Sequence, residues 1–158
     1  MEDKLKSIIV RLSECKKTLS TMESCTGGAL ASLITDISGA SLVFKYGAVT
    51  YSNEYKIKMG VSSEVIEKYS VYSMETAREM ARAISNFTSS DYGIGITGKL
   101  GEVDPNNLSG DNNRVFICIY DKKKDKFIDL DTYVDSNNRV DDKKEVLEFI
   151  VSKLDLYV

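Results

Sequence analysis

Residues 18–34 read TLSTMESCTGGALASLI and contain three local patterns in a row. Residues 18–23 alternate between polar and apolar side chains, which predicts a short strand. Residues 24–28 contain two glycines and predict a turn, and residues 29–34 have the composition of a helix. A strand that passes through a glycine turn into a helix is typical of α/β proteins.

Helices and strands alternate along the rest of the chain. Further helices are predicted at residues 2–16, 53–59, 62–69 and 74–87, and a last helix begins at Arg139 and carries the apolar pattern of residues 146–154. Further strands are predicted at residues 42–51, 92–97, 115–120 and 127–134, with a turn at residues 38–41. The strand at 115–120 is continuously apolar, as expected of a strand buried on both faces. We therefore predict an α/β fold over residues 1–158: a single compact domain with a mixed β-sheet flanked by helices.

Two segments suggest close approach or function. Gly93 and Gly95 lie on one side of the strand at 92–97, so another part of the molecule must approach that side closely. Residues 99–113 show no regular pattern and contain the only proline, Pro105. An irregular loop of this length in a compact domain is commonly functional or mobile.

Composition excludes several classes of partner. The net charge is −3, so there is no basic excess to neutralise the phosphates of a nucleic acid. There is no long uncharged apolar run, and the first residues lack the apolar stretch of a signal peptide, so no membrane association is expected. Cys15, Cys25 and Cys118 are odd in number and widely spaced, which indicates reduced thiols and a cytoplasmic location.

The chain contains no histidine. This excludes a Ser-His-Asp triad, a Cys-His dyad and every histidine-ligated metal site, and three cysteines are too few for a four-cysteine zinc site. We therefore expect no metal. Covalent hydrolysis would need a lysine, a carboxylate, a tyrosine or the N-terminal amine as its base.

Polar residues follow three predicted strands at the point where each strand ends. They are residues 23–28, residues 51–56 and the pair Thr97-Gly98. Ligands of open α/β sheets bind beyond the carboxyl ends of strands, so the three clusters are expected to converge on a site. The turn at 23–28 would aim backbone N–H groups and a helix end at an anion or oxyanion. The alternative is a tight turn in which Ser or Thr caps the helix.

Two cationic residues have equally open interpretations. Lys56 would act as a base only if desolvation or a neighbouring cation lowers its pKa, and it could instead be an ordinary surface lysine. Arg139, with Lys143 four residues later, could bind a phosphate or simply be solvated.

Five motifs, in this order, resemble those of the CinA C-terminal family, the nicotinamide-nucleotide amidases. They are Glu23-Ser24-Cys25-Thr26-Gly27-Gly28, Gly39-Ala40-Ser41, Val49-Thr50-Tyr51-Ser52-Asn53-Glu54-Tyr55-Lys56, Gly60-Val61 and Thr97-Gly98. The resemblance runs from about residue 5 to residue 155, so residues 1–158 are expected to form one domain of this kind.

The resemblance implies an amidohydrolase of pyridine-nucleotide salvage, which converts nicotinamide mononucleotide to nicotinic acid mononucleotide and ammonia. It implies Ser41 as nucleophile and Lys56 as base, with Tyr51 and Thr97 assisting proton transfer. It also implies that no metal or cofactor takes part and that the protein forms a homodimer. Ser24 is the second candidate nucleophile. The implied substrate-binding residues are Ser24, Cys25, Thr26, Gly27, Gly28, Gly98 and Arg139.

The chain departs from the family pattern around the expected pocket. The family continues Thr-Gly-x-Ala-Gly-Pro, whereas this chain has Thr97-Gly98-Lys99-Leu100-Gly101-Glu102. A later Pro-Val-Gly-Thr-Val strand entry is replaced by Asp111-Asn112-Asn113-Arg114-Val115, and Gly-Asp-Arg by Asn137-Asn138-Arg139. These changes support an alternative, a nucleotide-binding or partner-binding module that keeps the fold without turnover. A third hypothesis is a cysteine hydrolase that uses Cys25, although no histidine is present to activate its thiol.

Overall fold

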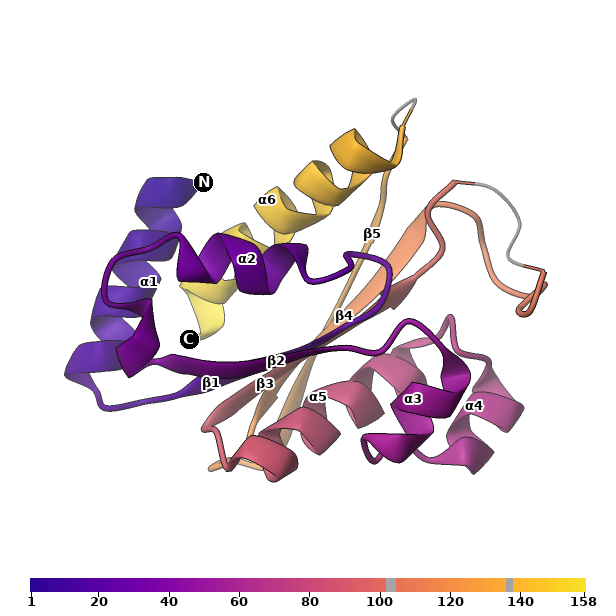
Figure 1. Ribbon diagram of the computed structural model, residues 1–158, viewed down its shortest axis with the longest axis horizontal. Helices are drawn as coiled ribbons and strands as arrows, with labels where there is room; N and C mark the ends of the chain where they lie inside the picture. Colours follow the sequence, from indigo (N-terminus) through magenta and orange to yellow (C-terminus); the bar gives the residue numbers. More distant parts are fainter. Residues whose placement is uncertain (102–104, 136–137) are drawn as a thin grey trace.

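Five strands form one mixed sheet at the centre of the computed structural model, which describes residues 1–101, 105–135 and 138–158 (Figure 1). The strand order is β2-β1-β3-β4-β5. β1 (Leu19–Glu23) pairs in parallel with β2 (Phe44–Val49) on one side and with β3 (Tyr92–Gly98) on the other. β4 (Arg114–Asp121) and β5 (Lys126–Tyr133) extend the sheet in antiparallel fashion. The prediction of an α/β fold with a mixed sheet is therefore confirmed.

Helices cover both faces of the sheet (Figure 1). One face packs against α1 (Glu2–Glu14), α2 (Ala29–Thr35) and α6 (Arg139–Tyr157), whose apolar side chains form the largest core cluster with the sheet. The other face packs against α5 (Met74–Thr88), beside which lie α3 (Asn53–Lys58) and α4 (Ser63–Tyr69). No helix in the described part of the chain has the length and apolar character needed to cross a membrane.

The strand predicted at residues 42–51 has different bounds in the structure. The strand predicted at 42–51 is shortened to β2, because a 3-10 helix, η1 (Ala40–Leu42), precedes it. At its other end, Ser52 caps α3 by accepting a hydrogen bond from the Tyr55 backbone N–H at 3.2 Å. The last helix begins at Arg139, as predicted, and the Asn138 side chain caps it by accepting hydrogen bonds from the Val140 and Asp141 backbone N–H groups.

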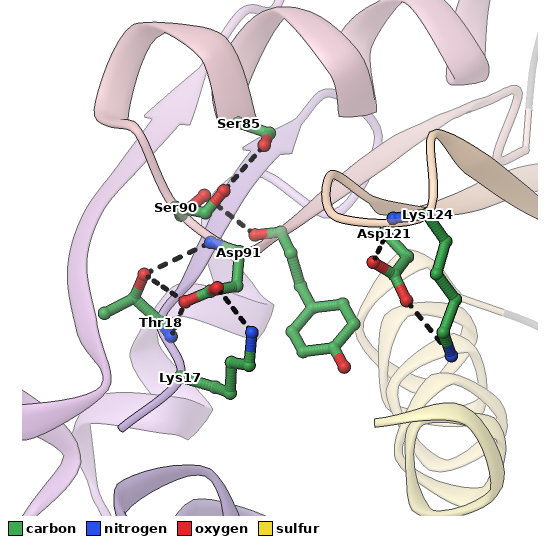
Figure 2. Close-up of polar contacts among 8 residues, drawn as sticks. Lys17, Thr18, Ser85, Ser90, Asp91, Asp121 and Lys124 are labelled. Atoms are coloured by element: carbon green, nitrogen blue, oxygen red, sulfur yellow. Dashed lines mark hydrogen bonds and ion pairs between the residues drawn. The ribbon is translucent and has the colours of Figure 1, made fainter. Parts of the chain in front are cut away.

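Hydrogen bonds tie together the amino ends of β1 and β3 (Figure 2). The Asp91 carboxylate accepts a hydrogen bond from Lys17 Nζ at 2.8 Å, and the Ser85 hydroxyl of α5 donates to the Ser90 carbonyl at 2.8 Å. The β4–β5 hairpin joins the same end, since the Lys122 backbone N–H donates to the Asp91 carbonyl. These contacts fix one end of the sheet and leave its opposite end for a site.

Gly93 and Gly95 allow α5 to lie directly on β3, as their position predicted. A Cβ atom on Gly93 would lie 2.1 Å from the Ala81 carbonyl oxygen, and one on Gly95 would lie 2.2 Å from the Ala77 carbonyl oxygen. Ile94 points to the other face and joins the core cluster under α1 and α6. The alternation of glycine and isoleucine therefore matches a helix backbone on one face and side-chain packing on the other.

Gly95→Ala should destabilise the protein strongly, because the added methyl group would overlap the α5 backbone, which cannot move without opening the core. We expect the free energy of unfolding to fall by about 3 kcal/mol in urea denaturation. Gly39→Ala is the matched control: its Cβ would meet open space, and only the left-handed φ of +87° opposes it, at a cost of about 1 kcal/mol. Equal losses in both variants would show that close packing of α5 on β3 is not the constraint.

Candidate active site

A cavity of about 860 Å³ opens at the carboxyl ends of the three parallel strands. Ser24 follows β1, Tyr51 and Lys56 follow β2, and Gly98 ends β3, and all four residues line this cavity. The structure thus brings together the three polar clusters that lie far apart in the sequence. Further walls come from the irregular stretch after β3, from the start of α6, and from Val71 and Tyr72 between α4 and α5. The volume lies within the range of small-molecule sites.

Lys56 is buried, although it lies on a short helix rich in polar residues. Its side chain is only 1% exposed. Lys56 Nζ donates to Ser24 Oγ at 3.0 Å and to the Thr50 carbonyl oxygen at 2.7 Å. The interpretation of Lys56 as an ordinary surface lysine is therefore wrong. A lysine and a serine in direct contact at the edge of a cavity have the geometry of a base beside a nucleophile.

Ser24 lies on a sharp turn between β1 and α2. Its backbone N–H donates to the Ile96 carbonyl, which continues the pairing with β3, while its own carbonyl accepts from the Gly27 N–H at 2.9 Å. Gly27 and Gly28 have φ values of +63° and +90°, which residues with a side chain adopt rarely. The chain can therefore turn immediately after Ser24 and leave its hydroxyl at the cavity.

The Glu23 carboxylate occupies the start of α2. It is fully buried and accepts hydrogen bonds from the Leu30 and Ala31 backbone N–H groups at 3.1 and 2.8 Å, and from Thr26 Oγ1 at 2.6 Å. The expectation that this helix end offers free N–H groups to an anion is therefore wrong for these two groups. The described residues that line the cavity do not include Thr26, Gly27 or Gly28. These three residues shape the turn without lining the cavity.

The structure does not bring Ser41 to the cavity. Ser41 is exposed on η1, and it is absent from the described residues that line the cavity. η1 precedes β2, whereas the cavity lies beyond the carboxyl end of that strand, and six residues of strand span roughly 20 Å. Ser24, the second candidate nucleophile, is the serine that contacts Lys56.

Tyr51 and Arg139 meet at the rim of the cavity. Arg139 Nη2 donates to the Tyr51 hydroxyl at 3.1 Å, and Arg139 Nη1 donates to the Leu100 carbonyl. Thr97 is placed differently: it is fully buried and donates to the Val71 carbonyl at 2.8 Å. Thr97 is not among the described residues that line the cavity. Its hydrogen bond to Val71 instead holds the end of β3 in place.

Cys25 lines the cavity as a protonated thiol. It is 4% exposed, and this burial raises the pKa of Cys25 to about 12, although the nearby Lys56 charge opposes the shift. A thiol that stays protonated at neutral pH is a poor nucleophile. The geometry therefore favours Ser24 over its neighbour.

Sequence reasoning missed two charged side chains in the cavity wall, Lys99 and Asp142, which are 5% and 3% exposed. The available signal for Lys99 was that it directly follows Gly98, at a point where the chain departs from the family motif. The signal for Asp142 was its spacing of one helical turn from Arg139. Glu102 and Asn137, at two other departures, lie outside the described residues.

The described cavity wall carries three cationic side chains, Lys56, Lys99 and Arg139, against the single carboxylate of Asp142. This balance favours an anionic ligand. The described part of the chain holds no group of three or more histidine, cysteine, aspartate or glutamate residues that could bind a metal ion.

Comparisons with known proteins agree with this arrangement. The family model of the CinA C-terminal domain matches residues 2–153. A CinA-like protein of Endomicrobium trichonymphae is 48% identical over 103 residues, which are 64% of this chain and 24% of that protein. The chain thus spans about a quarter of the length of the curated relatives that it matches first.

Solved structures show the same fold. A competence or damage-inducible protein from Enterobacter asburiae superposes with a TM-score of 0.89 at 23% identity, covering 98% of this chain and 96% of that one. A competence-damaged protein (CinA) superfamily protein from Escherichia coli gives a TM-score of 0.87 at 25% identity, covering 97% and 87%. The chain belongs to the CinA C-terminal domain family.

Proposed function

We propose that the protein is an amidohydrolase that deamidates nicotinamide mononucleotide, or a close relative, to the corresponding acid and ammonia. The observation that carries this proposal is the contact of 3.0 Å between Lys56 Nζ and Ser24 Oγ inside a cavity with a positive lining. The site residues of the proposal are Ser24 and Lys56 for chemistry, with Tyr51 and Arg139 at the rim.

Ser24 Oγ attacks the carboxamide carbon while neutral Lys56 takes its proton. The resulting tetrahedral intermediate collapses as its C–N bond breaks, and Lys56 returns the proton to the departing ammonia. Water then attacks the ester formed on Ser24 while Lys56 accepts a proton from the water, and Lys56 returns this proton to Ser24 Oγ as the ester bond breaks and the acid leaves. Burial of Lys56 favours its neutral form, because removing a charge from water is costly.

The charges of the cavity support a nucleotide substrate. Lys99 and Arg139 line it from two different elements, the segment after β3 and the first turn of α6. Both side chains suit a phosphate group, Arg139 through its fork of donors and Lys99 as a compact charge. A positively lined cavity also attracts an anionic substrate from solution.

The alternative is a nucleotide-binding module without turnover. Its support is that the altered stretch lies directly in the cavity wall, where Lys99, Leu100, Gly101, Asn106, Asn107 and Asn113 line the ligand space. An ammonia-release assay on nicotinamide mononucleotide separates the two functions. Ammonia release supports the amidase, whereas saturable thermal stabilisation by the nucleotide without release supports the binding module.

Ser24→Ala should abolish ammonia release, by at least about 10³-fold in kcat, because the attacking oxygen is lost. Ser41→Ala is the matched control, and its turnover should equal that of the wild type, because Ser41 is exposed at the far end of β2. Both rates are measured with far-UV circular dichroism as a check on folding. A dead Ser41→Ala variant beside an active Ser24→Ala variant would reverse the assignment.

Lys56→Arg should be nearly inactive although it keeps a positive charge, because a guanidinium does not release its proton in the working pH range. Lys58→Arg, on the same helix but exposed and paired with Glu54, should turn over normally. Steady-state rates of both variants are compared at several pH values. If Lys56→Arg keeps most of its turnover, Lys56 is only an electrostatic contact and the mechanism is wrong.

Alkylation with iodoacetamide at pH 8 should modify Cys15 and leave Cys25 and activity intact. Cys15 is exposed, whereas a pKa of about 12 leaves roughly one Cys25 thiol in 10⁴ ionised at that pH. Peptide mass spectrometry identifies the labelled cysteines, with urea-unfolded protein as the control in which all react. Rapid labelling of Cys25 that parallels loss of turnover would instead support a cysteine hydrolase.

A further inference from the structure

Lys99 is a buried cation without a carboxylate partner in the described part of the chain. It directly follows β3, is 5% exposed and lines the cavity. Lys99 Nζ donates one long hydrogen bond, 3.4 Å, to the Ser109 carbonyl, and lies 5.5 Å from the centre of the Tyr72 ring. No ion pair is formed by Lys99 with any described residue.

This arrangement is costly unless something else interacts with the charge. Moving an ammonium out of water is compensated only by good hydrogen bonds or by an opposite charge. A carbonyl at 3.4 Å and a ring at 5.5 Å give weak compensation. An ammonium has three donors, of which the Ser109 contact uses one, so two remain for a ligand in the cavity.

The backbone around Lys99 is held firmly. The Lys99 N–H donates to the Arg114 carbonyl at 3.2 Å, which joins it to β4. The next residue, Leu100, accepts a hydrogen bond from Arg139, and the Gly101 N–H donates to Asn113 Oδ1 at 2.9 Å. Lys99 is therefore presented to the cavity from a fixed position, beside the segment that Arg139 contacts.

We propose that Lys99, together with Arg139, forms an anion subsite that binds the phosphate monoester of the substrate and selects nucleotides over the corresponding nucleosides. This inference rests on the proposed function and deepens it. The two cations come from different elements and line one cavity, which also contains Ser24 and Lys56. A phosphate anchored there would hold the rest of the nucleotide inside the same cavity as the reacting pair.

The catalytic test compares kcat/KM for nicotinamide mononucleotide and for nicotinamide riboside. In Lys99→Met, the preference for the phosphorylated substrate should fall about 10- to 100-fold, through KM, because one charged hydrogen-bonding group is lost. Lys99→Arg should keep most of the preference. Lys122→Met removes an equal charge from the exposed hairpin at the opposite end of the sheet and should leave the preference unchanged. An unchanged preference in Lys99→Met, with turnover intact, would overturn the subsite and leave the amidase standing.

A binding test works even if the chain has no turnover. Isothermal titration of ribose 5-phosphate should give saturable binding to the wild type and to Lys122→Met, and weak binding to Lys99→Met. Ribose should not bind. Loss of binding in Lys99→Met without any ammonia release from the wild type would support the subsite and refute the amidase. Inorganic phosphate that binds as tightly as ribose 5-phosphate would overturn the assignment to a phosphate monoester.

Stability separates a ligand-binding role from a structural one. Without ligand, Lys99→Met should have a melting temperature no lower than the wild type, because it removes a poorly compensated buried charge. A clear decrease in melting temperature, with ribose 5-phosphate binding unchanged, would show that Lys99 only supports the loop and would overturn the proposal.

Discussion

The hydrogen bonds accepted by the buried Glu23 carboxylate hold the turn on which the candidate site depends. Three donors from the turn and the first part of α2 converge on this one fully buried group. With the ends of the turn fixed and its two glycines in left-handed conformation, Ser24 is directed toward Lys56. The Glu23 carboxylate thus accepts the N–H groups at the start of α2 that an anionic ligand could otherwise bind. Ligand binding is therefore left to side chains.

Parallel pairing explains why residues distant in sequence meet. β1 lies between β2 and β3 and runs in the same direction as both, so Ser24, Lys56 and Gly98 follow strand ends on one edge of the sheet. Antiparallel β4 begins at that same edge, because Val115 pairs with Gly98 at the carboxyl end of β3. Because of this reversal of direction, residues 99–101 and Asn106, Asn107 and Asn113 can form one wall of the cavity.

The sequence was sufficient for the order of helices and strands and for the convergence of polar strand ends, because both follow from local periodicity and strand direction. The sequence was not sufficient to show on which side of the sheet Ser41 lies, since a serine in a Gly-Ala-Ser turn looks the same at either end of a strand. Only the position of η1 before β2 shows that Ser41 lies far from the cavity. Lys99 and Asp142 were missed because their burial arises from contacts across the cavity, which have no local signature.

The lack of histidine connects the chemistry to the fold. A lysine can act as a base near neutral pH only where its charged form is disfavoured, by burial or by neighbouring cations. Lys56 is buried, and two further cations, Lys99 and Arg139, line the same cavity. The proposed chemistry therefore places the reacting lysine in the same cavity as the cations that would bind a substrate phosphate.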